Sequence, residues 1–589
     1  MFLPMDAKER RKLVETAMGR RSPSLVLSGA EVLNVYTGRT ERADVAVAGR
    51  WIAYVGDLEE ARIQPGTSTR VLDVSGCVLV PGYIEVHAHP FILYNPVTLA
   101  EYVLPLGTTM LISDNLFLFT RMEEKEMIRL WDELSRLPVK YGWWARLDPQ
   151  SHLPESLVHL FDDERVRRAL HHPLVLQAGE LSDWMPLLDG DKRMQGWIGA
   201  AHEWNKRVEG HAPGASHRTL ARLAAAGVTG DHESISPDEV WERLRLGYMV
   251  TLRHSSLRPD LPVLMEGLVR EQEVPWHRLM MTTDGSTPSY FRHGFVDHLI
   301  RTAIDAGCDP VRAYQMVTIN PAVYYRMDER IGGIAPGRLA DINVLSSLDE
   351  PVPLQVIANG ELVATDGQWV KSPPSIEWSR FSATQHSSPW RADVRQLRWQ
   401  VKEGETVPVL NLVNPVITKL TEETVSTGPD GALLSEDDDR LFAYLIDRNG
   451  RWITRSLIRG FGRNIDALVS TYNGSGDWLV IGRNIEAMVQ AVRRASDDGG
   501  GITWIQGGET YFHLPLPLLG MMSEWPMERL TEKADELTEK LKRFGHPFYD
   551  PIYTFLFLSS THLPQVRLTA DGVLRVKDRK IVYPAERWG

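Results

Sequence analysis

Strand-like and helix-like segments alternate between about residue 81 and residue 330 of this chain. The apolar TTMLISDN precedes the helical EEKEMIRLWDELSRL, VTGDHES precedes SPDEVWERLRLG, and LMMTTDG precedes GFVDHLIRTAIDAG. Alternating strands and helices with short connections are typical of a parallel sheet, and a length of about 250 residues suits a closed eight-stranded barrel. We therefore predict an α/β fold with a (β/α)8 TIM-like barrel over residues 81–333.

Two β-rich segments flank the predicted barrel. SLVLSGAEVLNVYTG and RADVAVAGRWIAYVG precede it, and LQVIANGELVATDGQWV, with Asn359 and Gly360 as a hairpin turn, follows it. Both segments contain short runs of β-branched residues separated by glycine-containing turns, and this similarity predicts a small β-sandwich built from both flanks. Residues 1–80 supply an N-terminal helix and one part of this sandwich, and residues 334–380 supply the remainder. Residues 381–589 mix strands such as DWLVIG with helices such as IEAMVQAVRRASDDGGG, which predicts a C-terminal α+β domain.

Composition narrows the classes of partner and compartment. The net charge of −12 gives no basic surface for binding nucleic acid. The two cysteines, Cys77 and Cys308, are too few for a disulfide framework, which fits a reducing compartment. The first residues do not resemble a signal peptide, and no run of about 18 apolar residues occurs. We expect a cytoplasmic protein with neither nucleic acid nor a membrane as partner.

Two histidines, His87 and His89, follow the apolar VLVPGYIEV with one residue between them. Side chains two residues apart on a strand point the same way, so both imidazoles can bind one metal ion at the end of a barrel strand. Imidazole suits Zn, Fe and other first-row metals. Such a pair also arises by chance, so alone it is weak evidence for a metal site.

Further polar side chains follow apolar strands in barrel order. Each also suits an ordinary role in a loop, a turn or a helix cap, but a barrel enzyme places its active site at these strand ends. Four histidines and two carboxylates suffice for two divalent ions about 3.5–4 Å apart that share a bridging hydroxide, which predicts metal-assisted hydrolysis. We expect Glu180 to span both ions. The six predicted ligands are His87, His89, Glu180, His211, His232 and Asp284.

Several segments carry a family resemblance. PGYIEVHAH resembles the metal-binding signature of the amidohydrolase superfamily, and IGGIAPGRLADINVLSSL is similar to its closing strand. More narrowly, EGHAPG, VTGDHES and TINPAVYY resemble the adenine deaminase family, and DDGGGITWIQGG and LPLPLLGMMS resemble that family's C-terminal domain. The resemblance spans nearly the whole chain. It implies hydrolytic removal of the 6-amino group of a purine base with two divalent metal ions per chain (Mn²⁺, Fe²⁺ or Zn²⁺), in a homodimer or homotetramer.

The same resemblance implies roles for individual residues. Asp284 matches a metal ligand that also takes a proton from the attacking hydroxide and passes it to the leaving amine. Glu233 is the candidate for protonating the purine ring, although a carboxylate at a helix start is an equally good interpretation. The candidates for binding the substrate are Phe91, Asp114, Arg253 and His254.

The chain also departs from the adenine deaminase pattern. The apolar residues 90–94 follow the histidine pair where many members carry an acidic residue and serines. An apolar lining favours an amine with an alkyl substituent, by about 0.8 kcal/mol per buried methylene. Both adenine and N6-methyladenine are therefore candidate substrates. SDNLFLF around Asp114 departs as well, which weakens the case for an accessory metal site there.

Two alternative functions stay open. Cyclic amide or imide hydrolysis uses a similar barrel and metals, but many such enzymes carry a carboxylated lysine at the strand end where this chain has Glu180. An inactive barrel that serves as a binding scaffold is the second alternative, against which the complete set of ligands argues.

Overall fold

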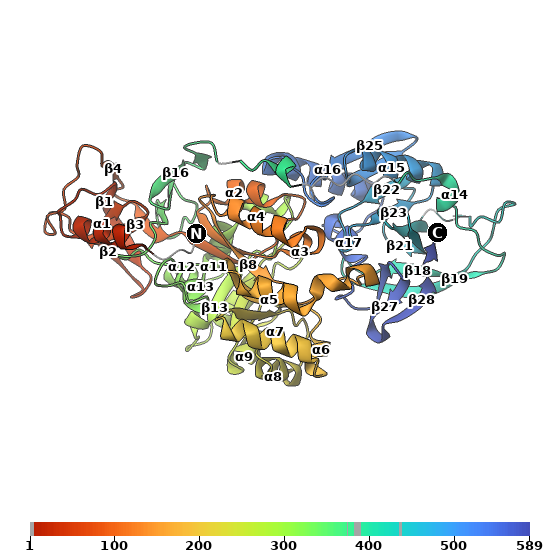
Figure 1. The fold of residues 1–589 in the computed structure, drawn as a ribbon, viewed down its shortest axis with the longest axis horizontal. Coiled ribbons are helices and arrows are strands. Elements are labelled where there is room, and N and C mark those ends of the chain that lie inside the picture. Colours follow the sequence, from red (N-terminus) through yellow and green to blue (C-terminus); the bar gives the residue numbers. More distant parts are fainter. Residues whose placement is uncertain (1–4, 374, 382–389, 435–436, 438, 589) are drawn as a thin grey trace.

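A computed structural model describes residues 5–588 of the chain, apart from residues 374, 382–389, 435–436 and 438. Eight parallel strands are hydrogen-bonded in sequence order and form the sheet at the centre of Figure 1. Most of their residues are buried on both faces, as expected where helices cover a parallel sheet. The strands are β6 (Tyr83–Ala88), β7 (Thr108–Ser113), β8 (Lys140–Ala145), β9 (Val175–Leu181), β10 (Arg207–Gly210), β11 (Gly230–Asp231), β12 (Met249–Arg253) and β13 (Leu279–Thr282).

The first and last strands of this sheet lie side by side. Thr282 Oγ1 on β13 donates a hydrogen bond of 2.6 Å to Glu85 Oε1 on β6, and the backbone N–H of Thr283 donates to Glu85 Oε2 at 2.9 Å. Helices follow the strands, among them α4 (Glu124–Leu134), α5 (Asp163–His171), α7 (Lys192–Glu203), α8 (His217–Ala225) and α11 (Val296–Asp305). The predicted (β/α)8 barrel is confirmed.

Local sequence signals place the strand ends that carry the site. Helix α9 (Pro237–Arg245) begins after Ser236, whose side chain accepts a hydrogen bond from the backbone of Glu239, and Pro237 occupies the first turn. The helix therefore cannot extend back into the residues after β11. His232 and Glu233 lie in that short connection and are buried at the mouth of the barrel.

The two flanks of the barrel join in one nine-stranded sheet, with the order β17-β16-β15-β14-β5-β1-β2-β3 and β4 beside β1. Its strands include β1 (Leu25–Asn34), β2 (Arg39–Ala48), β3 (Trp51–Gly56), β4 (Arg70–Asp73) and β17 (Gln368–Trp369). Strand β14 (Ile342–Leu345) pairs antiparallel with β5 (Val78–Pro81), so the segments before and after the barrel are directly hydrogen-bonded. Asn359 and Gly360 have positive φ angles of 50° and 78° between β15 (Gln355–Ala358) and β16 (Glu361–Thr365). These angles suit the predicted hairpin turn.

A second nine-stranded sheet and its helices form the C-terminal part of the molecule. Its strands follow the order β19-β18-β21-β20-β23-β22-β24-β25, with β29 beside β21, and β26, β27 and β28 form a separate small sheet. The strands are β18 (Thr406–Leu412), β19 (Thr418–Thr424), β20 (Leu441–Ile446), β21 (Trp452–Arg459), β22 (Ala467–Ser470), β23 (Trp478–Gly482), β24 (Gly501–Gln506), β25 (Glu509–Pro515), β26 (Val566–Thr569), β27 (Gly572–Arg575), β28 (Lys580–Pro584) and β29 (Glu586–Arg587). The main helices are α15 (Ile485–Asp497), α16 (Met527–Arg543) and α17 (Pro551–Phe557). Figure 1 shows α17 between the barrel and the C-terminal sheet. This mixed α and β composition matches the expectation.

The domain boundaries at 80/81, 333/334 and 380/381 stay predictions, and the last lies beside residues 382–389, which are outside the described part of the chain. Within the described residues, no helix combines the length and the apolar character that crossing a membrane requires.

Candidate functional site

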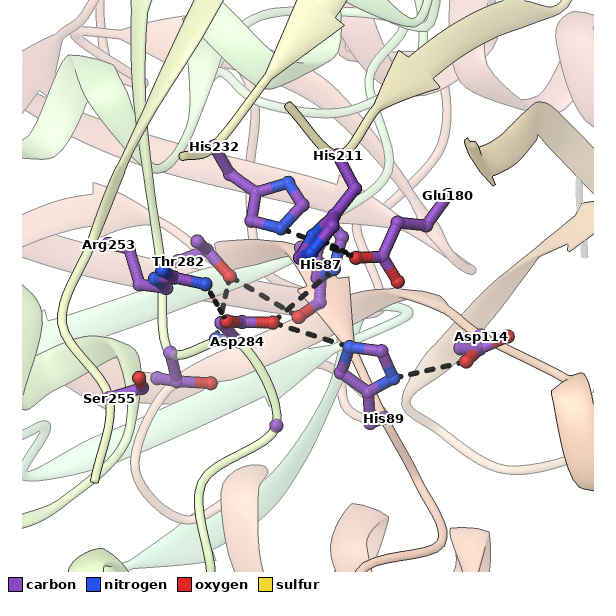
Figure 2. A network of polar contacts seen from close by, with 12 residues as sticks. His87, His89, Asp114, Glu180, His211, His232, Arg253, Ser255, Thr282 and Asp284 are labelled. Carbon is purple, nitrogen blue, oxygen red and sulfur yellow. Dashed lines mark hydrogen bonds and ion pairs between the residues drawn. The ribbon is translucent and has the colours of Figure 1, made fainter. Parts of the chain in front are cut away.

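The six predicted metal ligands lie together at the mouth of the barrel. Each stands at, or just after, the C-terminal end of a strand, and Figure 2 shows their polar atoms pointing toward one another. This arrangement follows from the topology, because the C-terminal ends of parallel barrel strands meet on one face. The ligands come from β6 (His87), β9 (Glu180), and the residues after β6 (His89), β10 (His211), β11 (His232) and β13 (Asp284).

Asp284 faces both histidines of the first strand. Its Oδ1 atom lies 3.4 Å from His87 Nε2 and 3.3 Å from His89 Nε2. These three residues offer ligand atoms within 4.8 Å of one another, which makes them one candidate group for a metal ion. On its other side, His89 Nδ1 lies 3.1 Å from Asp114 Oδ2, so the ring is oriented with Nε2 toward Asp284.

Glu180 lies among the other histidines. Its Oε1 atom is 2.7 Å from His211 Nδ1 and 3.6 Å from His232 Nε2. Two further groups of ligand atoms within 4.8 Å of one another result: Glu180 with His87 and His232, and His211 with His232 and Glu233. Neighbouring groups share a histidine, so the candidate positions for metal ions are adjacent. The sequence did not mark Glu233 as a candidate ligand.

The donor atoms fit divalent ions. Both ring nitrogens of His87 and the Nε2 atom of His232 are buried without a hydrogen-bond partner among the described residues. Several nitrogen–oxygen separations are 3.3–3.6 Å, which is too long for a good hydrogen bond. Two ligands about 2.0–2.1 Å from one tetrahedral ion are about 3.3–3.4 Å apart. The distances therefore suit ligands of a shared ion better than they suit direct pairing.

The charges of the cluster also favour cations. Burial raises the pKa of Glu180, but His211 and other nearby imidazoles outweigh it and hold this pKa well below its ordinary value. Burial lowers the pKa of His211 and of His89, yet Glu233 and Glu180 raise that of His211 to about 10, and Asp114 and Asp284 raise that of His89 to about 9. The carboxylates thus remain ionised and His89 and His211 hold balancing protons, whereas burial lowers the pKa of His87. Divalent ions can supply the same positive charge, and their binding would release those protons.

Two buried residues behind the ligands were not found from the sequence. Glu209 Oε1 lies 3.1 Å from His232 Nδ1 and 3.5 Å from His87 Nδ1, so one carboxylate faces two of the imidazoles. Arg146, directly after β8, lies 3.6 Å from Glu180 Oε2 and 3.4 Å from Asp114 Oδ1. Such contacts orient ligands and adjust their basicity.

Arg253 joins the two predicted catalytic carboxylates. Its Nη1 atom donates to Glu233 Oε1 at 2.8 Å and to Asp284 Oδ2 at 2.6 Å, and Nη2 donates to Glu233 Oε2 at 3.1 Å. Arg258 donates to the same Glu233 oxygen at 2.7 Å. Burial opposes ionisation of Glu233, but Arg253 outweighs it and holds the pKa of Glu233 well below its usual range. The surroundings therefore favour the carboxylate form over a proton donor.

The remaining substrate candidates lie in different places. The Phe91 ring meets the His89 ring edge-on at 5.6 Å and the Phe117 ring at 4.7 Å, which places an apolar wall beside the ligands. His254 is nearly buried and its ring lies 5.4 Å from that of His298. Asp114 and Arg253 both contact predicted ligands. Substrate binding by all four residues stays a prediction.

Comparison with known proteins decides the family. A protein of Halalkalibacterium halodurans named "Putative adenine deaminase" is 38% identical over 578 residues, which cover 98% of both chains. The chain belongs to the adenine deaminase family. A Bacillus cereus protein of the same name is 39% identical over 98% of this chain and 96% of its own, and the "Adenine deaminase" of Moorella thermoacetica is 30% identical over 98% of each. The Amidohydrolase family model matches residues 78–363, and the Adenine deaminase C-terminal domain model matches residues 415–580.

The adenine deaminase resemblance is thus confirmed, and the amidohydrolase family to which the barrel belongs generally uses divalent metals. The sequence of this family member contains a partial signal for Arg146 and Glu209, the two residues that the sequence analysis missed. Arg146 and Glu209 lie at the ends of β8 and β10, where the rule for barrel active sites applies equally. Arg146 stands in WWARLDP, where the two adjacent tryptophans obscure the alternation of polar and apolar residues that is typical of a strand. Glu209 is the first residue of EGHAPG, the segment that contains His211.

Proposed function

We propose that this member of the adenine deaminase family is a metal-dependent hydrolase that converts adenine to hypoxanthine and ammonia. The observation that carries the proposal is the convergence of six strand-end ligands in a chain with full-length adenine deaminase relatives. Water oxygen forms a bond with C6 of the base, the C6–N6 bond breaks, and the amine leaves with a proton. The same step on N6-methyladenine gives hypoxanthine and methylamine.

The chain's own residues would hold two divalent ions of the Mn²⁺, Fe²⁺ or Zn²⁺ type. Glu180 suits the role of spanning both positions, because its carboxylate lies among imidazoles from three strands. When bound, such ions lower the pKa of a water molecule from about 15.7 towards 7 and polarise the group under attack. The residues that would hold them are His87, His89, Glu180, His211, His232 and Asp284.

Asp284 would move the proton. Its Oδ1 atom faces His87 and His89, and its Oδ2 atom accepts from Arg253. This arrangement keeps the carboxylate ionised, as a base must be before it takes a proton from water. Asp284 would then deliver that proton to N6, which becomes a neutral leaving amine.

Glu233 would act close to the purine ring. Arg253 and Arg258 fix both oxygens of its carboxylate. To protonate the ring nitrogen, Glu233 would first have to receive a proton, which its low pKa opposes. Glu233 could donate a proton to the ring or only hydrogen-bond to it. A Glu233→Gln variant separates these two roles, since glutamine can still hydrogen-bond to the ring but cannot transfer a proton. Near wild-type kcat in this variant would exclude the donor role.

A substrate panel tests the proposed function. Adenine, N6-methyladenine, adenosine, guanine and a hydantoin are assayed with Mn(II) by ultraviolet spectroscopy, and the metal content of the same sample is measured. We expect turnover of adenine or N6-methyladenine with close to two metal ions per chain. Conversion of adenosine but not of the free bases would overturn the substrate class. A stable protein that binds no metal and turns over none of these compounds would support a scaffold.

Glu180→Gln tests the bridging role. We expect loss of turnover together with loss of at least one metal ion, because the amide cannot share its charge between two cations. Glu101→Gln, a partly buried residue of helix α2 (Pro96–Val103), is the matched control. Retained turnover with both ions still bound would exclude the bridging role.

The alternative of cyclic amide or imide hydrolysis is not favoured, because adenine deaminase relatives match the whole chain, including its C-terminal part. The expected homodimer or homotetramer is a further part of the proposal, which sedimentation velocity tests directly. The cytoplasmic location is proposed from the two unpaired cysteines.

A further inference from the structure

The segment 284–287 carries Asp284 and lies beneath the C-terminal domain. Asp284 has a φ angle of 46°, in the left-handed region that residues other than glycine adopt only where their surroundings hold them. Gly285 also has a positive φ, and a Cβ atom built there would lie 2.6 Å from His89 Cβ. The backbone of this segment therefore packs directly against a second predicted ligand, so a shift of the segment would move both Asp284 and His89.

The barrel itself holds only part of this segment. Thr282 Oγ1 accepts a hydrogen bond from the backbone N–H of Asp284 at 3.0 Å, and Tyr94 donates to the carbonyl of Ser286 at 3.0 Å. Arg253 also donates to Asp284 Oδ2 at 2.6 Å, and the backbone N–H of Ser256 donates to Ser286 Oγ at 3.3 Å. Among the described residues, these barrel contacts leave the carbonyl of Gly285 and the side chain of Thr287 to partners from elsewhere.

The C-terminal domain supplies those partners. The hydroxyl of Tyr553, on helix α17, donates to the Gly285 carbonyl. Asp550, which precedes α17, accepts a hydrogen bond of 2.9 Å from Thr287 Oγ1. Asp550 and Tyr553 are both more than nine-tenths buried. They reach the segment on both sides of Ser286, whereas the six predicted ligands all come from the barrel.

We propose that Tyr553 and Asp550 are positioning residues of the C-terminal domain that hold segment 284–287 so that Asp284 faces the other ligands. Their side chains bond to the Gly285 carbonyl and the Thr287 hydroxyl, and we therefore expect both to act through Asp284. Misplacing a catalytic group by about 1 Å can cost about a hundredfold in rate. The effect on rate rests on the function proposed above, whereas the effect on the segment itself does not.

Tyr553→Phe in the full-length protein removes only the hydroxyl. We expect kcat for adenine to fall about tenfold or more while KM changes less than about twofold. We also expect faster hydrogen exchange in residues 283–288 and about tenfold weaker binding of one Mn²⁺ to the metal-free protein. Tyr314→Phe is the matched control, because that buried hydroxyl donates to the Leu348 carbonyl at 2.8 Å.

Thr287→Val reaches the same segment from the barrel side and is expected to reproduce these changes, while Thr287→Ser keeps the hydroxyl and should recover activity. Unchanged exchange in residues 283–288 of Tyr553→Phe would overturn the proposal, as would an equal fall of kcat in Tyr314→Phe. Faster exchange with unchanged kcat would also overturn it. If the wild-type protein turns over no aminopurine, the proposed function fails, and exchange and Mn²⁺ affinity alone decide the positioning role.

Discussion

Replacement of Glu209 by glutamine tests how the site orients its imidazoles. The Glu209 side chain is 2% exposed, and its Oε1 atom faces the Nδ1 atoms of His232 and His87 at 3.1 and 3.5 Å. Burial raises the pKa of Glu209, but the hydrogen bond with His232 and the nearby His87 imidazole outweigh it and lower that pKa. The residue is therefore ionised at neutral pH. Each imidazole turns its Nε2 atom toward the other ligands, where that atom can bind a metal ion.

The size of the effect follows from this shared contact. Losing a partner that orients a metal-ligating histidine typically costs about 10–100-fold in metal affinity, or about 1.4–2.8 kcal/mol. Glutamine keeps one oxygen that can still accept from one imidazole, so we expect about tenfold weaker binding. His87 belongs to the candidate group with Asp284, His232 belongs to the group with Glu233, and both histidines belong to the group with Glu180. The loss of affinity should therefore extend to both ions.

The assay is competition between the metal-free protein and a chromophoric chelator for Zn²⁺ or Mn²⁺. Glu101→Gln on helix α2 is the control for removing a partly buried carboxyl elsewhere in the barrel. Affinities of Glu209→Gln within about twofold of wild type for both ions would refute the reasoning, since the expected loss is about tenfold. A weaker affinity in the control as well would show that the effect is not specific to the site.

Further predictions follow from buried contacts. Arg253→Met should destabilise the metal-free protein by about 3–5 kcal/mol in denaturant titrations, because it breaks a buried ion pair. It should also move the acid limb of the kcat/KM profile to higher pH, since Arg253 outweighs burial in lowering the pKa of Asp284 and activity requires the carboxylate. Burial raises the pKa of Asp297 to about 7 despite backbone hydrogen bonds. The protonated Asp297 carboxyl therefore contributes to the free energy of unfolding at low pH, and this contribution is lost as pH rises from about 4 through about 7. Asp297→Asn should therefore exceed wild type in unfolding free energy at about pH 8, by at most about 4 kcal/mol, and lose that advantage near about pH 4. Phe91→Ala should lower kcat/KM for N6-methyladenine relative to adenine by about fourfold, the value of one buried methyl group, and an unchanged ratio would exclude contact between Phe91 and the substituent.

The barrel and the convergence of the six candidate ligands could be predicted because both depend on local pattern. Strands followed by helices indicate a parallel barrel, and that topology brings residues such as His87 and Asp284 together although they lie far apart in the sequence. No knowledge of packing was needed, because every C-terminal strand end meets the same face. A common sheet for the two flanks, which the pairing of β5 with β14 forms, could be predicted for a similar reason. Similar β-rich segments precede and follow the barrel, and short strands on either side are stable when they pair with each other.

The contacts that hold the ligands depend on side-chain packing and could not be predicted. Tyr553 lies 268 residues from Gly285, and nothing local to α17 identifies its hydroxyl as a donor to that carbonyl. Glu209 was equally hidden, because a carboxylate one residue before a Gly-His pair suits many loops. Only the structure shows that it is buried against two imidazoles.

Arg253 and Asp114 show why a strand end alone does not assign a role. Both follow the rule for barrel active sites, and the sequence suggests that both contact the substrate. In the structure, Arg253 bonds to Asp284 at 2.6 Å and Asp114 lies 3.1 Å from His89. A guanidinium that binds two carboxylates has few donors left for a purine, and both oxygens of Asp114 are engaged, one by His89 and the other by the backbone N–H of Leu116. The polar groups at this barrel mouth therefore compete for a limited number of hydrogen bonds. We therefore expect specificity for the base to depend more on shape and on apolar walls such as the one predicted at Phe91 than on these two charges.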